Sequence, residues 1–175
     1  TGVQTCALPI FTQWSERQSP DAVVSMLNSY FGASEKVWSG YDVVIARLIA
    51  DEIFLVLARP DEAVQLARRL RDAACDALRP FGLTVGIGVN SGPVMEGMIG
   101  SGEIRVYDTI GDTVNTGARF CSAAAGGEIL VAAHIADEIG ASGHFGPAKF
   151  IEVKGKSGAI LVRPLMRSEE HTSEL

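Results

Sequence analysis

A pair of short apolar runs, separated by a tight turn, sets the fold class of this chain. The runs, Val43–Ile49 and Ile53–Leu57, are rich in branched side chains, which favour extended strands. The short Ala50-Asp51 turn lies between them, so the segment is predicted to form a β-hairpin. A hairpin at this place excludes an all-helical fold.

A helical pattern stands on each side of the hairpin. Ser19-Pro20-Asp21 supplies a capping hydroxyl, a proline for the first turn and an acidic side chain near the helix N-terminus. Apolar residues then recur at helical spacing to about Val37. A second helix is predicted to begin at Asp61 and to end at Gly82, with its arginines mostly outward.

The second half of the chain continues with shorter elements. Strands are predicted at Thr84–Val89 and Ile104–Asp108, and a helix from Asp112 to about Ala125. Helices and hairpins interleave without strict βαβ alternation, so we expect one α+β domain whose mixed sheet has helices mainly on one face. The remaining predicted elements are a strand at Ile129–Ala132, a helix near Ala133–Ile139, and strands around Phe150 and Leu161.

The two ends of the chain read as translations of one oligonucleotide. Residues 1–10, TGVQTCALPI, can be encoded by a DNA segment whose reverse complement, with one further T, encodes RSEEHTSEL, residues 167–175. That segment resembles a common sequencing adapter, and such foreign ends are set aside before fold reasoning. We therefore expect residues 11–166 to be the native domain, cut at both ends. The alternative is a pair of coincidental surface tails.

Composition excludes several functional classes. The chain carries 15 Lys and Arg against 21 Asp and Glu, a net charge of −6, so it lacks the basic balance that nonspecific nucleic-acid binding needs. The longest strongly apolar run, Ile53–Ala58, is far shorter than the roughly 20 residues of a membrane-spanning helix. Three cysteines cannot form a paired disulfide framework and are compatible with a reducing cytosol. We expect a cytoplasmic domain with no nucleic-acid partner.

Few side chains suggest chemistry by their spacing alone. Asn115 and Arg119 lie one turn apart on the helix that begins at Asp112, where they could extend the anion attraction of its N-terminus. Such a pair is more often just a solvated helix face. Asp51 is either a turn former or a ligand for a hard cation such as Mg²⁺. Lys154 is either a phosphate ligand or a surface lysine.

The order of these motifs along the chain is more specific than any one of them. Together they resemble the class III nucleotidyl cyclase catalytic domain over essentially Phe11–Pro164, and the stretch IGDTVN followed by Arg119 is the most specific part. The five segments, in order, are LIADEI (48–53), GIGVNSGPV (86–94), YDTIGDTVNTGAR (107–119), GEILV (127–131) and VKGK (153–156).

The resemblance implies a fold and a reaction. The fold is a ferredoxin-like βαββαβ core with a mixed, mainly antiparallel sheet and a C-terminal αβ extension, which works as a head-to-tail homodimer. In the reaction the ribose 3′-oxygen of a nucleoside triphosphate attacks the α-phosphate, giving a 3′,5′-cyclic nucleotide and pyrophosphate. Two divalent cations, Mg²⁺ or Mn²⁺, take part. One protomer supplies the metal half of each site and its partner the other half, so a monomer is expected to be inactive.

The resemblance also assigns roles by position. Asp51 looks like one of two metal-holding aspartates, Asn115 like the residue that orients the ribose, and Arg119 like the group that stabilises charge on the α-phosphate. The remaining positions bind substrate: Lys154 the terminal phosphates, Arg47 and Asp108 the base.

The sequence departs from the family pattern at the positions that follow. The other metal aspartate is expected just upstream of Phe11-Thr12, where the adapter-like segment stands, so the chain lacks that aspartate and a native first strand. Ala50 stands where the family usually has glycine. Arg47 replaces the lysine typical of adenylate cyclases, but Asp108 is typical of many of them, so ATP is favoured over GTP as substrate.

Three functional hypotheses follow from this. The first is an active cyclase encoded by the parent gene, of which this truncated chain is itself an inactive form. The second is a catalytically inactive cyclase-homology module that binds nucleotide or only dimerises, and the third is an unrelated ferredoxin-like binding domain. Sensor or membrane segments are expected only in the missing upstream part.

Overall fold

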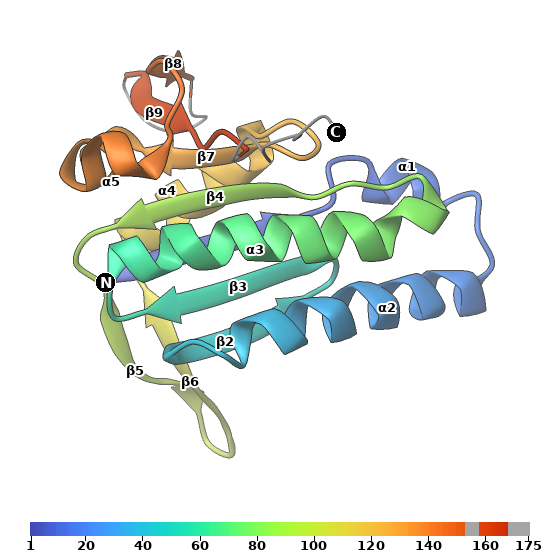
Figure 1. Ribbon diagram of the computed structural model, residues 1–175. Helices are drawn as coiled ribbons and strands as arrows, with labels where there is room; N and C mark the ends of the chain where they lie inside the picture. Colours follow the sequence, from blue (N-terminus) through green and yellow to red (C-terminus); the bar gives the residue numbers. More distant parts are fainter. Residues whose placement is uncertain (153–157, 168–175) are drawn as a thin grey trace, which may run out of the picture.

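The computed structural model describes residues 1–152 and 158–167. Its helices and strands follow the order that the sequence predicts, with strands β1 and β5 and the short helix α1 added (Figure 1). The elements are β1 (Gly2–Ala7), α1 (Phe11–Ser15), α2 (Pro20–Trp38), β2 (Val43–Ile49), β3 (Glu52–Leu57), α3 (Pro60–Leu78), β4 (Gly86–Ser91), β5 (Met95–Ser101), β6 (Ile104–Ile110), α4 (Asp112–Ala123), β7 (Ile129–Ala132), α5 (Ala133–Ile139), β8 (Lys149–Ile151) and β9 (Ile160–Pro164).

Seven strands form one sheet in the order β2-β3-β1-β4-β7-β9-β8. Within the described residues, β4 and β7 are its parallel pair and the other neighbours run antiparallel. The first four strands, with α2 and α3 as crossovers, make the ferredoxin-like βαββαβ core, and α5, β8 and β9 extend it. The predicted fold class is confirmed.

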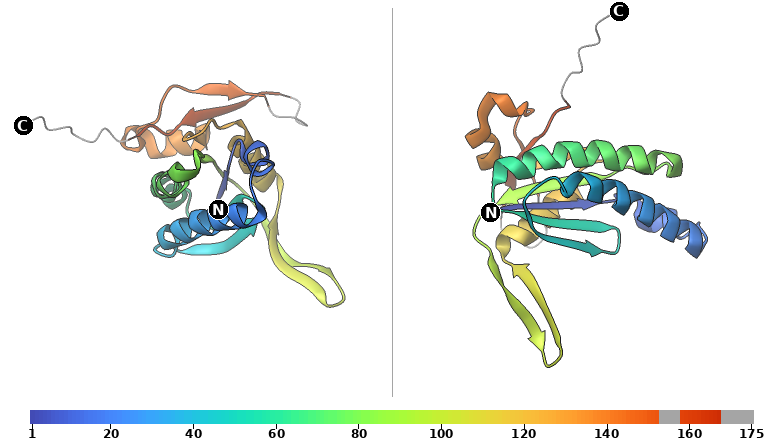
Figure 2. Two further views of the ribbon diagram at one scale, coloured as in Figure 1. Left: turned by 90° about the vertical axis from the view of Figure 1, so that its right-hand side faces the viewer. Right: turned by 60° about the horizontal axis from the view of Figure 1, so that its bottom comes forward.

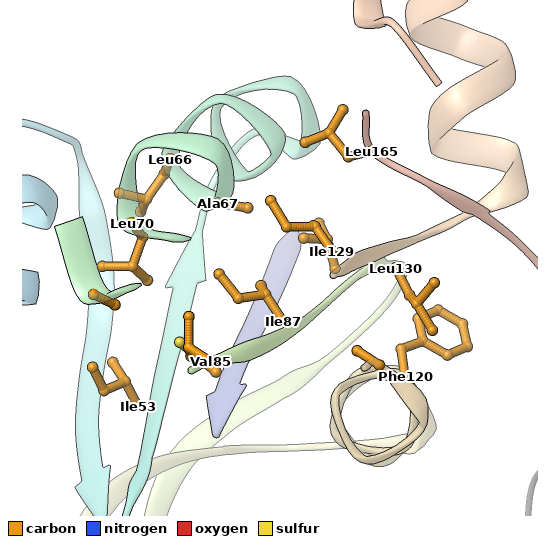
Figure 3. Packing of buried hydrophobic residues seen from close by; sticks show 14 of the residues in the cluster. Ile53, Leu66, Ala67, Leu70, Val85, Ile87, Phe120, Ile129, Leu130 and Leu165 are labelled. Carbon is orange, nitrogen blue, oxygen red and sulfur yellow. The ribbon is translucent and has the colours of Figure 1, made fainter. Parts of the chain in front are cut away.

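Helices cover both faces of the sheet. Helices α2 and α3 lie side by side on one face, in front of the sheet in Figure 1, and α4 lies behind it against β1 and β4. The alternation along β3 shows the two faces: Ile53 and Leu55 belong to the large core under α2 and α3, whereas Phe54 and Val56 belong to a smaller cluster with Val114 of α4. Figure 3 shows Leu66 and Leu70, which α3 contributes to this large core.

Strand β1, built from residues of the adapter-like segment, occupies the centre of the sheet. It pairs with β3 from Gly2↔Leu57 to Cys6↔Ile53 and with β4 on its other side. We expected no native strand here; the foreign origin of the segment stays a prediction, while the structure shows that residues 2–7 fill the place. The fit is imperfect, because Gln4 and Thr5 are buried and, among the residues that the structure describes, neither amide atom of Gln4 nor the Thr5 hydroxyl has a hydrogen-bond partner.

Strands β5 and β6 form a separate hairpin that extends away from the body of the domain (Figure 2). The sequence predicted β6 but not β5, whose residues include two glycines and no run of branched side chains. The hairpin carries a group of exposed apolar side chains, namely Met95, Met98, Ile99, Ile104, Val106, Tyr107 and Ile110. An exposed apolar surface of this extent is typical of an interface.

Candidate active site

The Asp51 carboxylate lies at the turn between β2 and β3, beside the end of β1. Its Oδ2 accepts a hydrogen bond from the backbone N–H of Leu8 at 3.1 Å. Ala50, before it, has a left-handed backbone with φ 53°, which glycine adopts more easily and which costs alanine about 1 kcal/mol. Burial, and then the negative charge of Asp51, raises the pKa of Glu52 above its ordinary value. The turn therefore carries negative charge that a cation would relieve.

The two predicted base-reading residues meet across the two sheets. Arg47 on β2 donates from Nε to Oδ1 of Asp108 on β6 at 3.3 Å, although the two are 61 residues apart in the chain. The same Oδ1 accepts the backbone N–H of Thr109 at 2.8 Å. Both side chains are partly exposed, at 28% and 38%, so a ligand can reach them.

Helix α4 presents Asn115 and Arg119 one turn apart. Asn115 is exposed and Arg119 is half-buried. The Nη1 of Arg119 is buried and has no hydrogen-bond partner within the part of the chain that the structure describes. An unpaired buried guanidinium nitrogen is costly, and an anionic ligand would satisfy it.

The start of α4 is held by contacts that the sequence motifs did not reveal. The side-chain amide of Asn90 on β4 donates to the backbone carbonyl of Thr113 at 3.0 Å, and the Thr113 hydroxyl donates to the carbonyl of Pro93 at 2.8 Å. Gly88 lets helix and strand touch, since a Cβ there would lie 2.3 Å from the carbonyl oxygen of Gly117. Asn90 stands inside a motif quoted above, but its partner is known only from the fold.

The predicted site residues fall into separate groups within one chain. Asp51 bonds Leu8 just beyond the end of β1, whereas the first turn of α4 is tied to Asn90, which pairs with Val3 near the start of that strand. Five residues of extended chain separate Val3 from Leu8, about 17 Å. The Asp51 end and the Asn115 end therefore do not converge in a single chain. Lys154 lies outside the described residues.

Comparison with known proteins identifies the family to which this fold and these motifs belong. The family model described as the adenylate and guanylate cyclase catalytic domain matches residues 6–163. The chain belongs to this family.

Individual relatives of the cyclase family agree with this match. A membrane guanylyl cyclase of Dictyostelium discoideum is 28% identical over 155 residues, and adenylate cyclase 1 of Rhizobium meliloti is 27% identical over 165 residues. Each alignment covers 86% of this chain, but only 10% and 25% of the respective relative. The crystal structure of the guanylyl cyclase Cya2 superposes with a TM-score of 0.85 at 25% identity, covering 98% of this chain and 94% of that one.

The comparisons identify a nucleotidyl cyclase catalytic domain and leave both adenylate and guanylate cyclases among its relatives. Because the chain spans a tenth and a quarter of these two relatives, it corresponds to one part of each. No helix in the described residues is long and apolar enough to cross a membrane.

Proposed function

We propose that the parent protein forms a 3′,5′-cyclic nucleotide and pyrophosphate from a nucleoside triphosphate, with ATP preferred. The observation that carries this proposal is the Arg47–Asp108 contact, because two residues that the resemblance assigns to one role, 61 positions apart in the chain, lie in contact. A donor and an acceptor side by side can read the edge of a base. Asn115 would orient the ribose, and Arg119 would stabilise charge on the α-phosphate as the 3′-oxygen attacks.

The hydrogen bonds of Asp108 favour adenine over guanine. Oδ1 is already occupied by Arg47 Nε and Thr109 N–H, while Oδ2 has no partner among the described residues. Adenine offers a single exocyclic amine to such an acceptor, next to the ring nitrogen N1 that can accept from Arg47. Guanine offers two adjacent donors, N1–H and the N2 amine, which suit two free carboxylate oxygens. One free oxygen fits adenine better.

The residues present do not fit the two cations that the family implies. Asp51 supplies one carboxylate, while the side chain of Ala7, which ends β1 beside it, has no ligand atom. No group of three or more metal-binding side chains occurs among the described residues. A hard cation needs several oxygen ligands, so we expect this chain to bind nucleotide through its own side chains and to turn over little or none of it.

A head-to-tail dimer would bring the separated groups together. The Asp51 end of one copy would face the Asn115 and Arg119 helix of the other. The exposed apolar side chains of the β5–β6 hairpin, and of the edge strand β2, supply the surface that such a contact needs: Val44, Leu48 and Ile49 on β2 are each about half exposed, at 50%, 51% and 56%. The nucleotide would then be bound between the two copies.

The test introduces a carboxylate at Ala7, the residue that ends β1 beside the Asp51 turn. An Ala7→Asp variant, with Mn²⁺ and either ATP or GTP, is assayed for cyclic AMP and cyclic GMP. We expect cyclic AMP from this variant and none from the starting chain. Adding Arg119→Ala to Ala7→Asp should lower the rate about 10²–10³-fold, as loss of a transition-state donor does. Arg17→Ala, in an exposed loop, is the matched control and should change nothing.

The competing hypothesis is a cyclase-homology module without catalysis, which the lack of a second aspartate at Ala7 beside Asp51 favours. It predicts that Ala7→Asp forms dimers and binds ATP, yet makes neither cyclic nucleotide. That result would overturn the catalytic proposal and establish the module. Absence of both nucleotide binding and dimers would overturn both.

A further inference from the structure

A cavity of about 470 Å³ lies along α3, on the face of the sheet opposite α4. Its walls are α3 side chains between Arg68 and Asp76, the side chain of Arg79 just after α3, and Arg167. The volume lies within the range of small-molecule sites. Because α4 carries Asn115 and Arg119 on the other face, this cavity is separate from the candidate active site.

Arg71 is the unusual residue of this cavity. It is only 2% exposed, and arginine is almost never buried to this degree without full pairing. Its Nε donates to Oδ1 of Asp72 at 2.9 Å, but its terminal nitrogens Nη1 and Nη2 have no partner among the described residues. Two parallel N–H donors of a planar guanidinium match two oxygens of a phosphate or a carboxylate.

The neighbouring charges favour an anion. Arg68 donates from Nη2 to the carbonyl of Gly143 at 2.9 Å, and Arg79 is paired with Asp76. The wall formed by α3 and Arg79 therefore holds three arginines against two aspartates, Asp72 and Asp76, in a chain whose overall charge is −6. Arg167 adds a further positive charge but belongs to the segment predicted to be non-native, so the inference rests on α3.

We propose that this cavity is a binding site for the phosphate group of a small phosphorylated molecule, held by the Arg71 guanidinium through Nη1 and Nη2. Arg79 and Arg68 flank the anion and add to its attraction. The cavity is larger than one phosphate group, and the remaining volume can hold the organic part of the ligand. A phosphate monoester should therefore bind more tightly than inorganic phosphate.

The test is calorimetric titration of the full chain with inorganic phosphate, phenyl phosphate and acetate at equal ionic strength. We expect one site for each phosphate compound, tighter for phenyl phosphate, and no binding of acetate. Arg71→Lys keeps the charge but loses the planar fork, and should weaken phosphate binding at least about tenfold. Arg79→Ala, at an exposed position, should keep the fold and weaken binding a few-fold. Arg17→Ala is the control, and a chain ending at Met166 should still bind.

Three results would overturn the proposal. One is that acetate binds as tightly as phosphate, which would make the cavity a carboxylate site. Another is that Arg71→Lys and Arg79→Ala, both shown to be folded by circular dichroism, bind phosphate as the starting chain does. Loss of binding on removal of residues 167–175 would likewise show that Arg167, and not α3, holds the anion.

Discussion

Replacing Gln4 by methionine should stabilise this protein. Gln4 is fully buried in the central strand, and both polar atoms of its side-chain amide lack hydrogen-bond partners within the described part of the chain. Because it is two residues before Cys6 on β1, it points into the large core beneath α2 and α3. An unpaired buried amide costs about 1–3 kcal/mol, and methionine has nearly the same shape without polar atoms. The free energy of unfolding should therefore rise by about 2 kcal/mol.

Urea unfolding followed by the fluorescence of Trp14 and Trp38 measures this change. In a chain of this length, 2 kcal/mol corresponds to a rise of about 4–8 °C in Tm. Gln18→Met, at an exposed position, is the matched control and should stay within about 0.5 kcal/mol. If Gln4→Met lowers stability or leaves it unchanged, the amide has partners in solution and the reasoning fails.

Two further predictions concern packing and thiol chemistry. Gly88→Ala should destabilise the fold by about 2–3 kcal/mol in the same urea unfolding assay, because its Cβ would lie 2.3 Å from the backbone of α4. Gly32→Ala on α2, where a Cβ meets nothing within 4 Å, should be neutral or stabilising. Burial, reinforced by the charge of Glu52, raises the pKa of Cys121 to about 12, and burial also raises the pKa of Cys6. Iodoacetamide at pH 8 should therefore modify only Cys75 in the native protein, which mass spectrometry can measure. Because these two thiols ionise at lower pH in the unfolded chain than in the folded one, the free energy of unfolding should fall as pH rises above 9. Equal labelling of all three cysteines at pH 8 would contradict the burial of Cys6 and Cys121.

The sequence was sufficient for most elements because each has a strong local signal. The Ser19-Pro20 and Arg59-Pro60 boundaries define the starts of α2 and α3, and the branched runs define β2 and β3. Strand β5 was missed because its pairing with β6, and not its own composition, makes it extended. Helix α4 lies on the face opposite α2 and α3, which no local pattern reveals.

The candidate site was predictable only in part, for the same reason. The motif order identified Arg47 and Asp108, but their contact depends on how β6 is placed against β2. Asn90 was inside a recognised motif, yet its hydrogen bond to Thr113 exists only after α4 has packed on β4. The roles of Asn115, Arg119 and Asp51 stay predictions, and Lys154 lies beyond the described residues.

The placement of Asp51 and Asn115 toward opposite ends of β1 has a genetic consequence. In the proposed head-to-tail dimer, each active site takes Asp51 from one chain and Arg119 from the other. A substitution of Asp51 and a substitution of Arg119 therefore affect different chains of the same site. A dimer of one chain substituted at Asp51 and one chain substituted at Arg119 would keep one of its two active sites intact. A cell expressing both alleles would thus regain part of the activity that either allele alone abolishes, whereas two lesions at the same end of β1 would not rescue each other.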